Sequence, residues 1–185
     1  MAMQHVRARR DSQCGVTLIE QIMVVVIVSV LTAVAMPSLV RLLRRNQVQV
    51  AQMDFFSALQ HARGMAVTTG KSVLFCPSHD GMRCSGETRW ESGWLIAHDR
   101  DRDGQPDATP LRTKVGYSGI TILGDSSRRL VRFRSDGSAS GTTNTLRFCS
   151  RGQPDQTLLV VISNVGRIRG ATASAAEAAS CASVR

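Results

Sequence analysis

The stretch Gly15-Val16-Thr17-Leu18-Ile19-Glu20 opens an apolar run that extends to Met36 and decides how the chain folds. A leader with three arginines precedes the glycine, and Glu20 is the only charged residue in the run. As a helix the run is long enough to cross the roughly 30 Å hydrocarbon core of a bilayer. A carboxylate there costs at least ~2.5 kcal/mol on insertion scales, so Glu20 is expected to have a function and a partner. Cleavage after Gly15 would remove the leader and keep the helix, the reverse of a secretory signal peptide.

These residues resemble the class III signal of type IV pilins and of the pseudopilins of type II secretion. The resemblance implies that a prepilin peptidase cuts after Gly15 and methylates Val16, and that Glu20 serves in assembly with other pilin subunits. This sequence departs from the usual pattern of that signal at Val16, where Phe is common, and at Cys14, where a basic residue is common. It also implies a single-pass protein of the bacterial inner membrane with a periplasmic C-terminal domain, which enters a pilus. The alternative is an ordinary signal anchor.

Four segments are expected along the chain: a leader at 1–15, a transmembrane and assembly helix at 16–37, an amphipathic helix at 38–70 and a β-rich periplasmic domain at 71–185. An apolar stripe predicts the packed face of the amphipathic helix, and Gly70 fits its C-cap. The stripe consists of Leu39, Leu43, Val50, Met53, Phe56, Leu59, Ala62 and Ala66.

Short apolar or alternating runs predict strands at 72–76, 93–98, 111–115, 120–123, 130–134, 146–149 and 158–163. Asp136-Gly137 lies between two of these runs and predicts a hairpin turn. The run 158–162 has no polar face, which predicts a central strand buried on both sides. The Ala- and Ser-rich tail at 171–179 is expected to be loose unless Cys181 holds it. The fold class expected is therefore α+β.

Four of the five cysteines remain after the leader is removed: Cys76, Cys84, Cys149 and Cys181. In an oxidising compartment an even count indicates disulfides, and three pairings are possible. We favour Cys76 with Cys84 and Cys149 with Cys181, because each bond closes a segment rich in Gly, Ser or Ala. Zinc is the rival, but the spacing lacks C-x2-C and a nearby histidine pair.

An ordered set of short motifs narrows the resemblance to the FimT/GspH group of minor pilins and pseudopilins. The motifs are Phe75-Cys76-Pro77-Ser78 with Asp80-Gly81, Gly93-Trp94-Leu95, residues 99–104, Phe133 with Asp136-Gly137, Leu146-Arg147-Phe148-Cys149 and Val165-Gly166-Arg167-Ile168-Arg169. This resemblance implies a long pilin helix packed on an antiparallel β-sandwich-like domain.

Gly166-Arg167-Ile168-Arg169 resembles the G-R-x-R motif of the FimT branch, which is implicated in binding DNA for uptake. Two arginines at i and i+2 of an extended segment point to one face, and each guanidinium can grip a phosphate. Net charge supports a polyanionic partner: residues 111–185 carry 11 basic and 4 acidic side chains. Arg128, Arg129, Arg132 and Arg134 are candidates to extend the patch. The alternative is an edge strand that carries arginine against aggregation.

Asp99, Asp101 and Asp103 have the spacing of the first ligands in an EF-hand calcium loop. Pro110, however, occupies the position where that motif requires a bidentate glutamate. A polar turn is favoured over calcium. The sequence contains no nucleophile elbow and no phosphate-binding glycine loop, so neither an enzyme nor a cofactor is expected.

The expected function is that of a FimT-type minor pilin, which contributes to pilus biogenesis and binds DNA without regard to sequence during natural transformation. The expected partners are other pilin subunits, the prepilin peptidase, DNA and the inner membrane before assembly. One alternative is a GspH-type minor pseudopilin of a type II secretion system, and another is a structural priming subunit without a ligand.

Overall fold

The structure, a computed structural model, describes Gly15, residues 17–150 and residues 153–183. It divides into two compact units, Met1–Arg41 and Leu42–Arg185. The leader up to Cys14 and Val16, the expected first residue after cleavage, lie outside the described residues.

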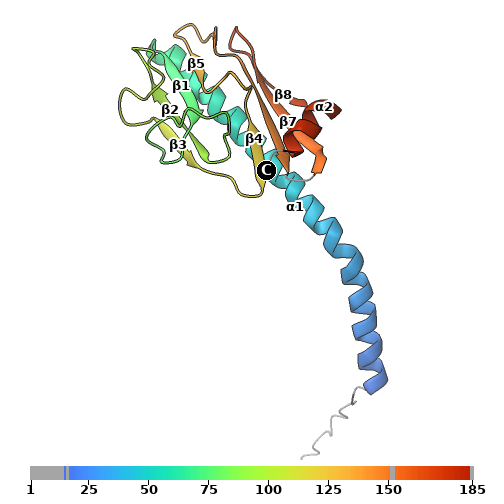
Figure 1. Cartoon of the computed structure of the whole chain (residues 1–185). Coiled ribbons are helices and arrows are strands. Elements are labelled where there is room, and N and C mark those ends of the chain that lie inside the picture. Colours follow the sequence, from blue (N-terminus) through green and yellow to red (C-terminus); the bar gives the residue numbers. More distant parts are fainter. Residues whose placement is uncertain (1–14, 16, 151–152, 184–185) are drawn as a thin grey trace, which may run out of the picture. The chain divides into compact units, whose positions relative to one another are not determined.

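Helix α1, Leu18–Thr69, begins in the first unit and ends in the second (Figure 1). Among the described residues it is the one helix long and apolar enough to cross a membrane. The hydroxyl of Thr17 accepts a hydrogen bond from the backbone N–H of Glu20 at 3.4 Å, as an N-cap residue does. The carboxylate of Glu20 is exposed and has no ion pair with any described residue.

The part of α1 in the second unit buries a stripe of small and aromatic residues. Its buried members are Val48, Ala51, Phe55, Ala58, Leu59, Ala62 and Ala66. The predicted stripe shared only its last three members with this face, and it was wrong at Val50 and Met53, which are 51% and 68% exposed. The buried face therefore lies around the helix from the predicted one. It is lined by alanines, whose small side chains let the sheets approach the helix closely. The helix ends at Thr69, followed by Gly70 with φ +64°, as a C-cap requires.

Two antiparallel sheets of four strands pack beside this helix, so the predicted α+β class is confirmed (Figure 1). The first sheet has the order β3-β2-β1-β5, with β1 at Val73–Pro77, β2 at Gly93–His98, β3 at Arg112–Val115 and β5 at Val131–Phe133. The second has the order β4-β6-β7-β8, with β4 at Ile120–Leu123, β6 at Asn144–Ser150, β7 at Gln153–Ile162 and β8 at Ile168–Thr172. A short helix, α2, follows at Ala175–Ala182.

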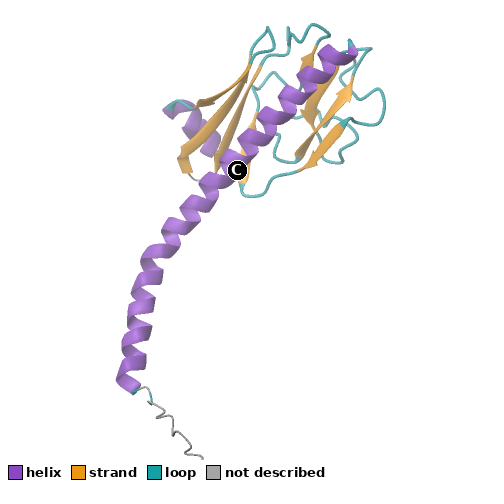
Figure 2. Ribbon diagram, turned by 180° about the vertical axis from the view of Figure 1, so that it is seen from behind, coloured by secondary structure: helices purple, strands orange, loops and turns teal. Residues whose placement is uncertain are grey.

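Phe55 of α1 joins the two sheets into one core. Its ring centroid lies 5.5 Å from that of Phe75 on β1 and 5.0 Å from that of Phe148 on β6, both at near-perpendicular angles. Edge-to-face pairs of this kind are favourable beyond the area they bury. Figure 2 shows the second half of the helix running across both sheets. All residues of this core lie in the second unit, so that unit has a complete core of its own.

The Asp136-Gly137 turn forms, but the predicted hairpin around it was wrong. The turn closes through hydrogen bonds from Arg134 N–H to Ser138 O and from Gly137 N–H to Arg134 O, both 2.8 Å. The preceding strand β5 pairs with β1, whereas the following strand β6 pairs with β4 and β7. The turn therefore carries the chain from one sheet to the other.

Strand β7 lies between β6 and β8, as its unbroken apolar run predicted. Val160 and Ile162 enter the core on one face, and Leu159 on the other face is only 5% exposed. Helix α2 packs on this second face, against β7 and β6.

The tail at 171–179 is not loose: it completes β8 and then begins α2. Ser174 and Glu177 form a capping box, in which the serine hydroxyl accepts from Glu177 N–H and the carboxylate accepts from Ser174 N–H. The S-x-x-E spacing was a readable signal that the prediction missed. Two disulfides, Cys76–Cys84 and Cys149–Cys181, are present, the pairing that the sequence favours. The second ties α2 to β6.

Removal of the Cys149–Cys181 bond should destabilise the second unit more than removal of Cys76–Cys84. The first spans 32 residues of sequence and the second 8. In the chain-entropy account, the free energy of unfolding falls by roughly 4 kcal/mol without Cys149–Cys181 and by roughly 2.5 kcal/mol without Cys76–Cys84. Paired Cys→Ala variants, unfolded in urea and followed by circular dichroism, provide the comparison. An equal or larger loss for Cys76 and Cys84 would contradict it.

Candidate nucleic-acid interface

The Gly166-Arg167-Ile168-Arg169 motif lies in the hairpin between β7 and β8. We call residues 163–169 the arginine loop. Ser163 closes it: its N–H donates to Arg167 O at 3.0 Å, its carbonyl accepts from Gly166 N–H at 2.9 Å, and its hydroxyl accepts from Arg167 N–H at 3.2 Å. Ile168 and Arg169 then pair with Ile162 and Val161 of β7. The loop is therefore tightly hydrogen-bonded rather than open.

The side chains of Arg167 and Arg169 project from the same side of the chain. Ile168 between them is 7% exposed and belongs to the main core, whereas both arginines are exposed. Since side chains alternate along an extended segment, the two guanidinium groups share the side opposite the core. Among residues 17–150 and 153–183, neither side chain has an ion pair or hydrogen bond. Two cations two residues apart in the sequence thus lack a counter-charge among the side chains that the structure describes.

Gly166 lies against the turn that links the two sheets. We call residues 134–138 the Gly137 turn. An ideal Cβ on Gly166 would lie 1.8 Å from Gly137 O, and the φ of Gly166 is +75°. The N–H of Ala139 donates to Asn164 O at 2.9 Å, which fastens the loop and the turn beside this contact. Glycine is required here both for its conformation and for its lack of a side chain.

Arg63 of α1 is the third part of this contact. Its Nε donates a hydrogen bond to Gly137 O at 3.0 Å. Sequence reasoning found Gly166 and the turn but missed Arg63, because 74 residues separate it from Gly137 and no local pattern indicates the pairing.

The Gly137 turn carries charges of both signs. Arg134 is exposed, and the turn places it three residues from the glycine that touches the arginine loop. Ser138 holds the pKa of Asp136 below its usual range, because its hydroxyl and backbone N–H hydrogen-bond that carboxylate. Asp136 therefore stays ionised at neutral pH and offsets part of the positive charge.

The other predicted patch residues have different surroundings. Arg132 does not extend a free patch, since its Nε donates to the fully buried carboxylate of Asp99 at 2.7 Å. Arg128 donates to Gly141 O and lines a surface hollow that also contains Asp125 and Glu177. Arg129 is exposed. Of the four, Arg134 belongs to the turn whose Gly137 contacts Gly166 of the motif.

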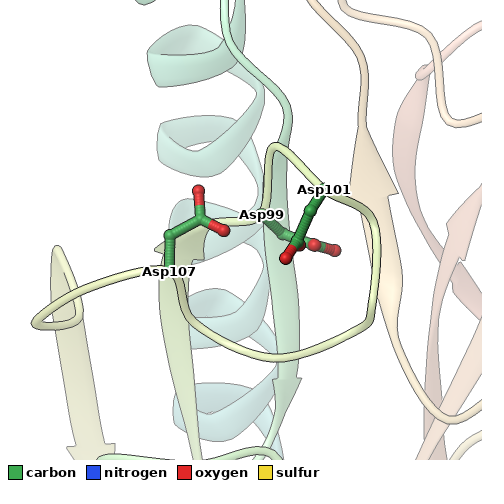
Figure 3. A group of neighbouring side chains, drawn as sticks. All are labelled: Asp99, Asp101 and Asp107. Carbon is green, nitrogen blue, oxygen red and sulfur yellow. The ribbon is translucent and has the colours of Figure 1, made fainter.

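The acidic loop after β2 gathers carboxylates, but not the predicted three. Figure 3 shows Asp99, Asp101 and Asp107, whose oxygens lie within 4.8 Å of one another. Asp103 instead accepts a hydrogen bond from Gln105 N–H at 2.7 Å. Arginines balance two of the grouped carboxylates: Arg132 pairs with Asp99, and Arg100 pairs with Asp107 at 2.9 Å. The backbone N–H and guanidinium of Arg100 also hold the pKa of Asp107 below its usual range. The polar turn favoured over calcium stays an untested prediction.

Comparison with known proteins places these features in a family. A family model described as type II transport protein GspH matches residues 51–166, more than half of the chain. The crystal structure of the type IV minor pilin FimU of Pseudomonas aeruginosa (strain PAO1) aligns with a TM-score of 0.57 and 25% identity, over 71% of this chain and 92% of that chain. The minor pseudopilin EpsH of the Vibrio cholerae type II secretion system aligns with a TM-score of 0.50 and 13% identity, over 70% and 96%, and shares the fold. No curated protein sequence matches this chain.

Gly166→Ala should destabilise the protein more than Gly141→Ala does. Both glycines have positive φ, but an added Cβ meets nothing within 4 Å at Gly141 and meets Gly137 O at Gly166. The left-handed conformation alone costs an alanine roughly 1–2 kcal/mol, and overpacking adds roughly 1–3 kcal/mol. Urea unfolding of both variants separates the two contributions. Equal losses would mean that the contact with Gly137 adds nothing.

Proposed function

Because this chain belongs to the GspH family, we propose that it is a minor type IV pilin that binds DNA without regard to sequence and contributes to DNA uptake. The family and the neighbouring structures already assign a role as a minor pilin or pseudopilin in a type IV pilus or a type II secretion system. The apolar start of α1 fits a membrane-anchored pilin with a C-terminal domain. The observation that carries the finer proposal is the exposed Arg167–Arg169 pair, which has no counter-charge among the described residues.

The chemistry of this pair suits a phosphate backbone. A planar guanidinium can donate two parallel hydrogen bonds to one phosphate, and Ile168 anchors the segment between the two arginines in the core. Phosphate contacts position a protein on DNA but carry no base code, so binding should be independent of sequence and sensitive to salt. After cleavage at Gly15 the chain would hold 20 basic and 13 acidic residues, which favours a polyanion over long range.

At the other end of the chain we propose that Gly15 is the processing point, Val16 the methylated N-terminus and Glu20 an assembly residue. The exposed carboxylate of Glu20 has no ion pair within the described part of its own chain. In a filament the N-terminal amino group of a neighbouring subunit could form an ion pair with this carboxylate. The pair would lower the free-energy cost of placing both charges in an apolar environment. In this proposal the bulk of the chain faces the periplasm before it enters the pilus.

A minor pseudopilin of a type II secretion system is the second candidate, favoured by the description of the matched family. It needs the same helix and assembly residue, but no affinity for DNA. A priming subunit without a ligand would likewise need no affinity for DNA. DNA binding therefore separates the proposed function from both.

Replacing Arg167 and Arg169 with alanine should weaken DNA binding in a salt-dependent way. If each arginine neutralises one phosphate, the slope of log K against log salt should fall in magnitude by about 1.8. Fluorescence anisotropy of full-length protein in non-ionic detergent, with two unrelated duplexes, measures this.

Arg83→Ala is the matched control, because Arg83 is exposed in the loop between β1 and β2. It should leave the slope unchanged. Wild-type protein that does not bind DNA at low salt, or a double variant that binds like wild type, would favour the pseudopilin.

Glu20→Ala should block incorporation into filaments without blocking membrane insertion, because the charge is needed only when subunits pair. Sheared filaments and membrane fractions, probed for the variant and for Gln21→Ala as control, give the result. Normal incorporation of the Glu20 variant would refute the assembly role.

Mass spectrometry of the membrane form should give a mature chain that starts at Val16.

A further inference from the structure

We propose that Arg63 is a positioning residue: it fixes the arginine loop so that Arg167 and Arg169 can engage phosphate. The consequence for DNA rests on the function proposed above, whereas the effect on the loop does not. Arg63 acts through Gly137, whose carbonyl lies between α1 and Gly166.

Gly137 and Gly166 are both buried, and their backbones touch. A buried carbonyl oxygen needs a hydrogen-bond donor, since leaving it unpaired is costly. The Nε–H of Arg63 supplies that donor to Gly137 O at 3.0 Å. The same Nε would lie 3.1 Å from an ideal Cβ on Gly166, so it is close to both glycines. One nitrogen of α1 therefore stabilises the contact between the loop and the turn.

The loop depends on this contact because the two elements belong to different sheets. The arginine loop extends from β7 and β8, whereas the Gly137 turn follows β5, and these strands do not pair. A second link lies beside them: Ala139, directly after the turn, donates its N–H to Asn164 O of the loop. Without Arg63 the turn would separate from the loop to reach water, and Arg167, next to Gly166, would lose its fixed position.

Arg63 also carries a charge that could itself touch DNA. It is half-buried and has no ion pair among the described residues. Positioning and direct phosphate contact must therefore be separated by experiment. Two neutral side chains of matching length allow this. In Arg63→Gln an amide nitrogen takes the place of Nε and keeps a donor, whereas in Arg63→Met a methyl group takes that place and provides none.

Hydrogen exchange of the full-length chain in non-ionic detergent tests the positioning without DNA. Peptides that cover residues 134–139 and 163–169 should exchange about fivefold faster in Arg63→Met, in keeping with the loss of one hydrogen bond. Arg63→Gln should stay close to wild type. Unchanged exchange in Arg63→Met would overturn the proposal.

DNA binding of the same variants, measured across a salt series, tests the consequence. Arg63→Met should bind duplex DNA about fivefold more weakly than Arg63→Gln. Equal weakening in both variants, with the salt slope reduced by about 0.9 in each, would identify a direct phosphate contact and overturn the positioning role. Faster exchange in Arg63→Met, in a protein whose wild type does not bind DNA, would uphold the positioning of the loop and refute the DNA function.

Discussion

The structure depends on one helix face that two sheets share. Phe55 and the alanines around it form this face, and the aromatic rings of β1 and β6 meet on it. A larger residue at Ala51, Ala58 or Ala62 would separate a sheet from the helix, because each of these side chains is fully or almost fully buried. Since both sheets close on the same helix, a turn from one sheet and a hairpin from the other meet above it. Arg63, Gly137 and Gly166 make contact there.

Several arginines in this protein differ from Arg167 and Arg169 in having a carboxylate partner. Arg132, Arg100 and Arg147 pair with carboxylates and hold loops in place. Arg167 and Arg169 have no such partner among the described residues, although a buried isoleucine and a closed hairpin fix their backbone. Holding unpaired cations on a rigid support brings no benefit to stability. It suits a site that awaits an anion, because little conformational entropy then has to be lost on binding.

The sequence was informative where a signal is local and misleading where packing decides. The Gly15–Glu20 stretch, the alternation of strands and the apolar run of β7 predict elements from a few neighbouring residues. The helix face was misplaced because a pattern of large apolar residues gave too little weight to alanine at Ala51 and Ala58. The hairpin at Gly137 was wrong because turn chemistry cannot say which sheet each flanking strand joins. Arg63 could not be found at all, since its partner is distant in sequence and is a backbone carbonyl rather than a charge.

A double-mutant cycle on DNA affinity tests the central claim, that the contact between the two glycines exists to present Arg167 and Arg169. The cycle compares wild type, Arg63→Met, the Arg167→Ala and Arg169→Ala double variant, and the combination of all three. Residues that act through one another give non-additive effects. The account predicts that the triple variant binds DNA as weakly as the double variant and no more weakly. A further loss in the triple variant, equal to that of Arg63→Met alone, would show that Arg63 acts independently and would contradict the account.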